Sequence, residues 1–231
     1  EAIDPKRFLH LKRYNLHLRG APSPNARLQF PTRQTFPLTK TRGQWLFAAN
    51  SSGSLHDVLS VYYRPFVDAG EQCFRFLGGP WEMAFCGIRS GGGQCILCES
   101  SSCVKLQKCS IGGMGNMLCA KDEGKLFATD GLVAMHNATA TLDHCCVEQT
   151  GMLKGAGVRA VDFATANISD TNFRNIRMCA LSVSGKGRVD AKRCVFRDLQ
   201  GAAFAAGPRA MDGERIAAPQ GGGGEGETIM A

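Results

Sequence analysis

The sequence lacks the features that mark a membrane-spanning, secreted or zinc-binding protein. It contains no apolar run of about 18 residues and no charged-then-apolar leader, so we expect neither a membrane span nor a secretion signal within it. Only one Cys-x-x-Cys pair occurs, Cys95 and Cys98, and no second pair follows it at zinc-finger spacing. Because residues three apart on a strand point to opposite faces, these two thiols are not expected to meet one ion. We therefore predict no metal and no cofactor.

Sustained helical periodicity is also missing. No segment combines a repeat of about 3.6 residues with helix-capping signals. Instead, apolar and polar residues alternate over short runs, and the intervals between these runs are filled by Gly, Ser, Asn and Asp. This pattern predicts short strands joined by tight bends. A hydrophobic content of 44% suits a buried core in one domain or one solenoid of 231 residues.

An eight-residue phrase, which we call the octet, recurs along the chain. Its five copies begin at Trp81, Val104, Ala140, Ala166 and Val189, at intervals of 23, 36, 26 and 23 residues. Places 1, 3 and 8 are apolar or small in every copy, and place 6 is Cys in all but one. Self-similarity at intervals of about 20–50 residues is typical of stacked repeat units. The octet therefore sets the alignment for all further predictions.

Two sets of octet places are predicted to face the interior. The core at places 3 and 8 consists of Met83, Leu106, Leu142, Ile168, Ile88, Ile111, Val147, Phe173 and Phe196. A structural ladder at place 6 consists of Cys86, Cys109, Cys145, Thr171 and Cys194. The cysteine count of eleven is odd, and parallel stacked Cβ vectors do not favour disulfide geometry. We interpret the ladder cysteines as reduced, small apolar fillers, which favours a cytoplasmic or nuclear location.

The octet predicts one rung of a parallel β-helix. Places 1 and 3 alternate as in a strand with one buried face, and a second short strand follows about 15 residues after most octet starts. Stacked rungs would lie about 4.8 Å apart and bury their apolar positions against each other. The alternative is a β-sandwich, whose strands also recur at short spacing. A sandwich has no reason to keep one phrase in register, so we favour the solenoid.

The octet carries a resemblance to a known superfamily. The pattern apolar-x-apolar-x-x-Cys/Asn-x-apolar resembles the repeat of right-handed parallel β-helix proteins, the pectate-lyase-like superfamily, over about residues 44–207. Residues 79–113 are similar to the eukaryotic branch that contains the SHC SH2-domain-binding proteins and the β-helix F-box proteins. The resemblance implies an all-β, right-handed solenoid and, in that branch, a scaffold that binds another protein. It says little about function, because one fold hosts many activities.

Composition divides the chain into three parts. Residues 1–43 form a basic arm with an opening rung, in which nine Lys and Arg residues face two acidic ones, whereas residues 44–231 balance at 18 of each. One interpretation of the arm is contact with nucleic acid, an acidic protein or anionic lipid, but we favour a solvated cap over the open end of the solenoid. The arm lacks the interleaved aromatics of single-strand binders, so neither nucleic acid nor a membrane is an expected partner. We predict about six to seven rungs over residues 44–207 and a disordered Gly-rich tail over 208–231.

Two segments outside the octets are predicted in more detail. Residues 45–48 and 55–61 fit strands, and the Ser-rich residues 51–54 fit the bend between them. The long interval after Val104 contains an insertion within residues 112–130, where glycines would allow a projecting loop. Loops on a rigid scaffold commonly carry binding sites, although an insertion can equally be neutral.

Places 4 and 5 of the octet supply the best cluster of candidate catalytic residues. These are Asp143, His144, Asp170, Lys192 and Arg193. Stacking would bring Asp170 between His144 and Arg193, and acid–base catalysis needs such proximity. Alternating charges on a solvent-exposed face, which form weak ion pairs, give the same pattern. No paired-Asp motif, His-Gly dipeptide or Asp-rich calcium loop occurs, so no catalytic residue is expected.

Two functions from different classes follow from these observations. The first, which we favour, is a non-catalytic scaffold that binds another protein through its outer sheet and the loop within residues 112–130. The second is a carbohydrate-active enzyme, a lyase, epimerase or hydrolase that acts on a polysaccharide along the groove of the helix.

Overall fold

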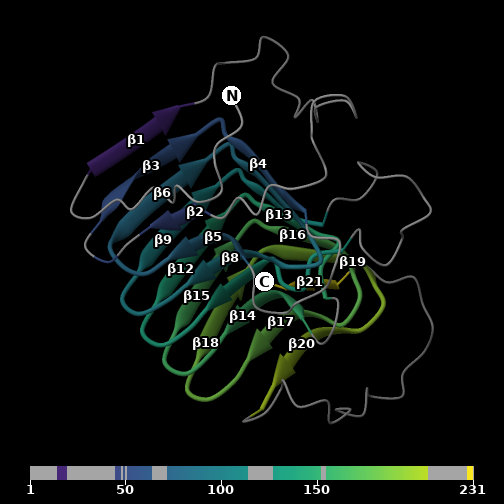
Figure 1. Cartoon of the computed structure of the whole chain (residues 1–231). Helices are drawn as coiled ribbons and strands as arrows, with labels where there is room; N and C mark the ends of the chain where they lie inside the picture. The colour runs from purple at the N-terminus through teal and green to yellow at the C-terminus, as the bar shows by residue number, and fades with distance from the viewer. Residues whose placement is uncertain are drawn as a thin grey trace, which may run out of the picture.

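The computed structural model describes residues 15–19, 45–47, 49, 51–63, 72–113, 127–151, 155–207 and 228–230. All regular structure in this part of the chain is β-strand, and no helix long and apolar enough to cross a membrane is found in it. The strands form three sheets of seven strands each, and within each sheet the strands stack along one common axis (Figure 1).

We number the sheets in the order in which each turn of the chain visits them. The first sheet contains, in spatial order, β1 (Asn15–Arg19), β3 (Ser52–His56), β6 (Pro80–Ala84), β9 (Cys103–Gln107), β12 (Thr139–Asp143), β15 (Thr165–Ser169) and β18 (Arg188–Lys192). The second contains β4 (Leu59–Tyr63), β7 (Gly87–Gly91), β10 (Ser110–Gly112), β13 (Cys146–Glu148), β16 (Asn172–Ile176), β19 (Cys194–Leu199) and β21 (Thr228–Met230). The third contains β2 (Trp45–Phe47), β5 (Gln72–Phe76), β8 (Gln94–Cys98), β11 (Leu132–Ala134), β14 (Ala156–Ala160), β17 (Cys179–Val183) and β20 (Ala202–Ala206).

This arrangement confirms the predicted fold class, an all-β parallel β-solenoid of the right-handed type. Neighbouring strands pair in parallel throughout the described residues, apart from β19 and β21. The chain returns to the first sheet five times between β3 and β18, so it makes about five turns. Six to seven rungs were expected, against about five turns in the structure.

The prediction for residues 51–61 was also wrong in detail. Residues 52–54 belong to strand β3 and do not form a bend, and the single strand expected over 55–61 is two strands, β3 and β4. The two strands meet at Asp57, whose φ of 56° turns the chain from the first sheet to the second. Aspartate adopts this left-handed backbone more readily than most residues, but it is not specific for it, so the corner was missed.

Strand pairing aligns the octets residue for residue. In the first sheet Leu106 pairs with Met83 and Leu142, and Leu142 pairs in turn with Ile168. These four side chains are buried, with at most 2% of their surface exposed. In the second sheet the place-8 residues stack in the same manner, and they are Ile88, Ile111, Val147, Phe173 and Phe196. Burial of each such side chain stabilises the fold by about 1.5–3 kcal/mol.

Aromatic rings close the core near its N-terminal end. Phe47 stacks on Phe76 with ring centroids 4.5 Å apart, and Trp81 packs against Phe47 at 4.3 Å. Such pairs contribute about 0.5–1.5 kcal/mol beyond their buried area. The cluster joins the third sheet to the first octet and fixes the first complete rungs.

The corner between the first and second sheets repeats at every rung. Each octet has a left-handed residue at place 5, and with Asp57 these residues form what we call the corner column: Asp57, Phe85, Lys108, His144, Asp170 and Arg193, with φ between 49° and 56°. The next residue faces the interior, where the ladder residues are buried. The thiols of Cys86, Cys109 and Cys145 donate to carbonyls of the preceding rung, for example Cys86 to Leu55 at 3.4 Å and Cys145 to Leu106 at 3.5 Å. At these three places the ladder thus connects neighbouring rungs through reduced thiols.

The end of the chain adds one strand to the second sheet. Thr228–Met230 pairs antiparallel with β19, within the segment that the sequence analysis interpreted as a tail. The sequence Thr-Ile-Met has high strand propensity, and the edge of β19 offers unpaired backbone groups. Residues 114–126 of the predicted insertion loop lie outside the described residues, as do residues 1–14 and 20–43 of the basic arm.

Close packing at the start of β14, where the chain enters the third sheet, leaves no room for a side chain at Gly157. A Cβ there would lie 2.6 Å from the carbonyl oxygen of Ala180 and 3.1 Å from the Phe173 ring. We expect Gly157→Ala to lower the free energy of unfolding by about 1–3 kcal/mol, because the backbone of the next rung must shift. Urea denaturation measures this, with Gly207→Ala as the matched control, since a Cβ at Gly207 meets nothing within 4 Å. Equal midpoints for the two variants would contradict the packing described.

Candidate functional site

The outward residues of the first sheet, together with the corner column, form one polar surface that we call the outer face. On its last three strands the outward residues are Thr139, Thr141, Asp143, Thr165, Asn167, Ser169, Arg188, Asp190 and Lys192. They point outward because places 1 and 3 of the same strands fill the core, and successive side chains on a strand alternate in direction. The same repeat that builds the interior therefore arranges the polar groups in columns.

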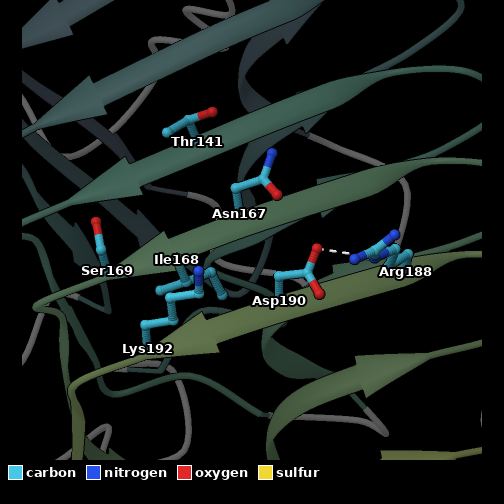
Figure 2. A pocket seen from close by; sticks show the side chains of 7 residues that line it. All are labelled: Thr141, Asn167, Ile168, Ser169, Arg188, Asp190 and Lys192. Atoms are coloured by element: carbon cyan, nitrogen blue, oxygen red, sulfur yellow. Dashed lines mark ion pairs between the residues drawn. The ribbon is translucent and has the colours of Figure 1, made fainter. Parts of the chain in front are cut away.

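A shallow groove of about 290 Å³ crosses the outer face (Figure 2). It is lined by Thr141, Asn167, Ile168, Ser169, Arg188, Asp190 and Lys192. Figure 2 shows Thr141 and Asn167 on successive strands, with Asp190 on the next strand in the same column. Arg188 forms an ion pair with Asp190 at 2.8 Å. The groove therefore presents hydroxyl and amide groups beside a paired charge, which suits hydrogen bonding to a polar ligand.

Four of the five candidate catalytic residues gather at the corner beside this groove. The Asp143 carboxylate accepts from the Ser169 hydroxyl at 2.9 Å and lies 2.9 Å from Nδ1 of His144. One rung further, Arg193 donates to both oxygens of Asp170 at 2.7 and 2.6 Å. The fifth candidate, Lys192, lines the groove and is not part of this cluster.

Both carboxylates of the cluster favour the ionised form. The hydrogen bond from Ser169, followed by the His144 ring, lowers the pKa of Asp143. The hydrogen bonds and charge of Arg193 lower the pKa of Asp170. A general acid in glycoside chemistry needs the opposite, a carboxyl group whose pKa is raised so that it holds its proton. The cluster therefore fits ion pairing or ligand coordination better than proton donation.

A charged column on the outside of the second sheet was not anticipated. The nearly buried Arg89 reaches across Gly112 to Glu148, at 2.7 Å, and also donates to Ser110 at 2.7 Å. The other oxygen of Glu148 accepts from Arg174 at 2.6 Å. These residues occupy the place directly after the octet, so extending the aligned phrase by one residue would have revealed the column.

A second buried ion pair joins Asp130 to Arg159 at 2.9 Å, with both side chains at most 5% exposed. Burial raises the pKa of Asp130, although Arg159 opposes this. The carboxylate also accepts from the Ala156 amide at 2.8 Å and from Gln94 at 3.3 Å. It is thus enclosed and fully engaged, which indicates a structural role. Asp130 lies between two octets, so the alignment of the octets could not indicate that it pairs with Arg159.

No protein-family model, curated protein or solved structure matches the chain. The function must therefore be argued from the octet, the fold and the geometry of the outer face.

Proposed function

We propose that the protein is a non-catalytic β-solenoid scaffold that binds another protein through the outer face. The observation that carries this proposal is the regular, shallow and polar character of that face. A parallel sheet offers a flat surface with side chains at fixed spacing, and hydrogen-bonding groups along it can recognise a protein partner. The loop within residues 112–130 remains part of the proposal, although most of it lies outside the described residues.

The charge of the outer face favours a protein over a polyanion. From β3 to β18 and along the corner column, its basic residues are Lys105, Lys108, Arg188, Lys192 and Arg193, and its acidic residues are Asp57, Glu82, Asp143, Asp170 and Asp190. Over this part of the face five charges of each sign cancel, and ion pairs such as Glu82 with Lys105 connect several of them. Nucleic acids and uronate polymers favour an excess of positive charge. This part of the face has none, so a partner with a mixed polar surface fits it better.

The chemistry of the carboxylates argues against catalysis. Asp143 and Asp170 have lowered pKa values and are engaged by neighbouring donors. Asp130 has a raised pKa but is enclosed by Arg159 and the Ala156 amide. None of these three carboxyl groups therefore combines a raised pKa with access to a ligand.

The second candidate is a carbohydrate-active enzyme, and the groove favours it. Thr141, Asn167 and Ser169 offer hydroxyl and amide groups that could bind a neutral sugar, with Asp190 nearby. Against it, Phe85 is the one Phe, Tyr or Trp of the outer face among the described residues, and it lies in the corner column, not in the groove. Sugar-binding grooves usually include an aromatic ring on which a pyranose can stack.

The narrower resemblance to the SHC SH2-domain-binding and β-helix F-box proteins belongs to this proposal. It supports a protein-binding role because residues 79–113 are similar to that branch, for which the resemblance implies a scaffold that binds another protein. The reduced thiols of the ladder support a cytoplasmic or nuclear location, where such thiols persist.

Position-specific photo-crosslinking tests the proposal. We expect a benzoylphenylalanine placed at Asn167, on the outer face, to give discrete crosslinked proteins in an extract of the native cells. The same group at Asn172, an exposed residue on the second sheet, should give none. Equal crosslinking at both positions would contradict docking on the outer face. Product release from a panel of uronates and galactans, lost in Asp170→Asn, would instead establish the enzyme.

A further inference from the structure

We propose that Asp143, His144 and Asp170 form a binding site for a divalent transition-metal ion, and that Zn²⁺ fits their donor set best. This inference does not depend on the docking proposal, because it concerns only the corner beside the groove. It departs from the sequence analysis, which predicted no metal because it considered the cysteine pair.

The donor set fits a first-row transition ion. One imidazole nitrogen and two carboxylate oxygens lie within 4.8 Å of one another. Zn²⁺ binds such donors at about 2.0–2.2 Å, which places neighbouring donors of a tetrahedral site roughly 3.4 Å apart. The side chains are 58% exposed for His144, 34% for Asp143 and 26% for Asp170, so small rotations can close the remaining distance. An imidazole ligand also disfavours Ca²⁺ and Mg²⁺, which take oxygen donors.

The backbone holds the three residues on adjacent rungs. Asp143 ends β12, and the left-handed corner places His144 directly after it. The amide of His144 donates to the Ser169 carbonyl at 3.1 Å, and the amide of Asp170 donates to the Lys192 carbonyl at 3.1 Å. The Ser169 hydroxyl in addition orients the Asp143 carboxylate. Ligands on a rigid sheet lose little freedom on coordination, and a hydrogen bond from outside the ligand set typically sharpens such a site.

A positive group of the protein already lies at this site. The competing group is Arg193, which occupies both oxygens of Asp170 but is itself 63% exposed. An exposed ion pair is screened by solvent and contributes little, so coordination displaces the guanidinium into water. Three protein ligands leave at least one position on the ion open.

Calorimetric titration of the full, reduced chain with ZnCl₂ tests the site. We expect saturable binding of one ion, and a loss of affinity of at least about tenfold in both His144→Gln and Asp170→Asn. The matched controls are His136→Gln and Asp190→Asn, which change the same residue types outside the cluster and should bind as the parent does. Ser169→Ala should weaken binding less, by about tenfold or under, because it removes only an orienting hydrogen bond.

Cobalt replaces zinc to exclude the cysteines as ligands. A site of imidazole and carboxylates should give weak visible bands of Co²⁺ without the intense near-ultraviolet band of a thiolate ligand. A thiolate band, absence of heat with ZnCl₂ in the parent chain, or parent-like affinity in His144→Gln would each overturn the assignment. Circular dichroism of every variant checks that the exposed substitutions leave the fold intact.

Discussion

Replacing Leu142 with Asp is expected to lower the free energy of unfolding by roughly 4–5 kcal/mol or more, and to unfold a solenoid of ordinary stability. The Leu142 side chain is fully buried and stacks between Leu106 and Ile168. A carboxylate there would have no partner and would interrupt the apolar column of the first sheet. Because each rung contacts only its neighbours, the damage should extend to the rungs before and after it.

The control for Leu142→Asp lies one residue away on the same strand. Thr141 points outward and pairs with Lys105 on one side, so Thr141→Asp should change the free energy of unfolding by less than about 1 kcal/mol. Urea denaturation and amide hydrogen exchange measure the two effects. If Leu142→Asp kept the parent midpoint, this side chain would not lie in the interior, and the alignment of the octets would be wrong.

Removing the carboxylate of Asp130 is expected to cost about 3–5 kcal/mol, because Asp130→Ala removes a counter-charge 2.9 Å from the buried guanidinium of Arg159. It also removes the acceptor of the Ala156 amide. The double variant Asp130→Leu with Arg159→Met should recover much of the loss, since apolar groups of similar volume often replace a buried ion pair without penalty.

An exposed ion pair of the same kind provides the comparison. Asp190 and Arg188 are 2.8 Å apart, close to the 2.9 Å of the buried pair, but they are 38% and 70% exposed. Asp190→Ala should therefore cost less than about 1 kcal/mol. Thermal or urea unfolding gives the loss of unfolding free energy for Asp130→Ala and Asp190→Ala, and the two ion pairs differ mainly in burial. Similar losses at Asp130 and Asp190 would show that burial does not set the strength of the inner pair.

The fold class could be predicted because the octet keeps its register. Pairing of Leu106 with Leu142, and of Leu142 with Ile168, follows the octet alignment without any shift. The corners could not be predicted, because Phe85, Lys108 and Arg193 have no propensity for the left-handed backbone that they adopt. The rung imposes that conformation through hydrogen bonds to its neighbours, and local sequence does not record it.

The site was only partly accessible to sequence reasoning. Stacking placed Asp170 beside Arg193, and the structure has them paired. Lys192 lies in the same outward column as Asp143 and Ser169, and only the direction of its long side chain places it in the groove. The groove, and the pair of Asp130 with Arg159 on neighbouring rungs, depend on how the side chains pack against each other. No short pattern encodes such contacts.

The corner column has a consequence for how this molecule can diversify. Phenylalanine, lysine, histidine, aspartate and arginine all occupy the same left-handed position, so the backbone there accepts apolar, basic and acidic side chains alike. Successive positions are about one strand spacing, 4.8 Å, apart. Single substitutions in the corner column can therefore change the chemistry of this exposed edge during evolution, while the backbone hydrogen bonds of the rungs behind it stay the same.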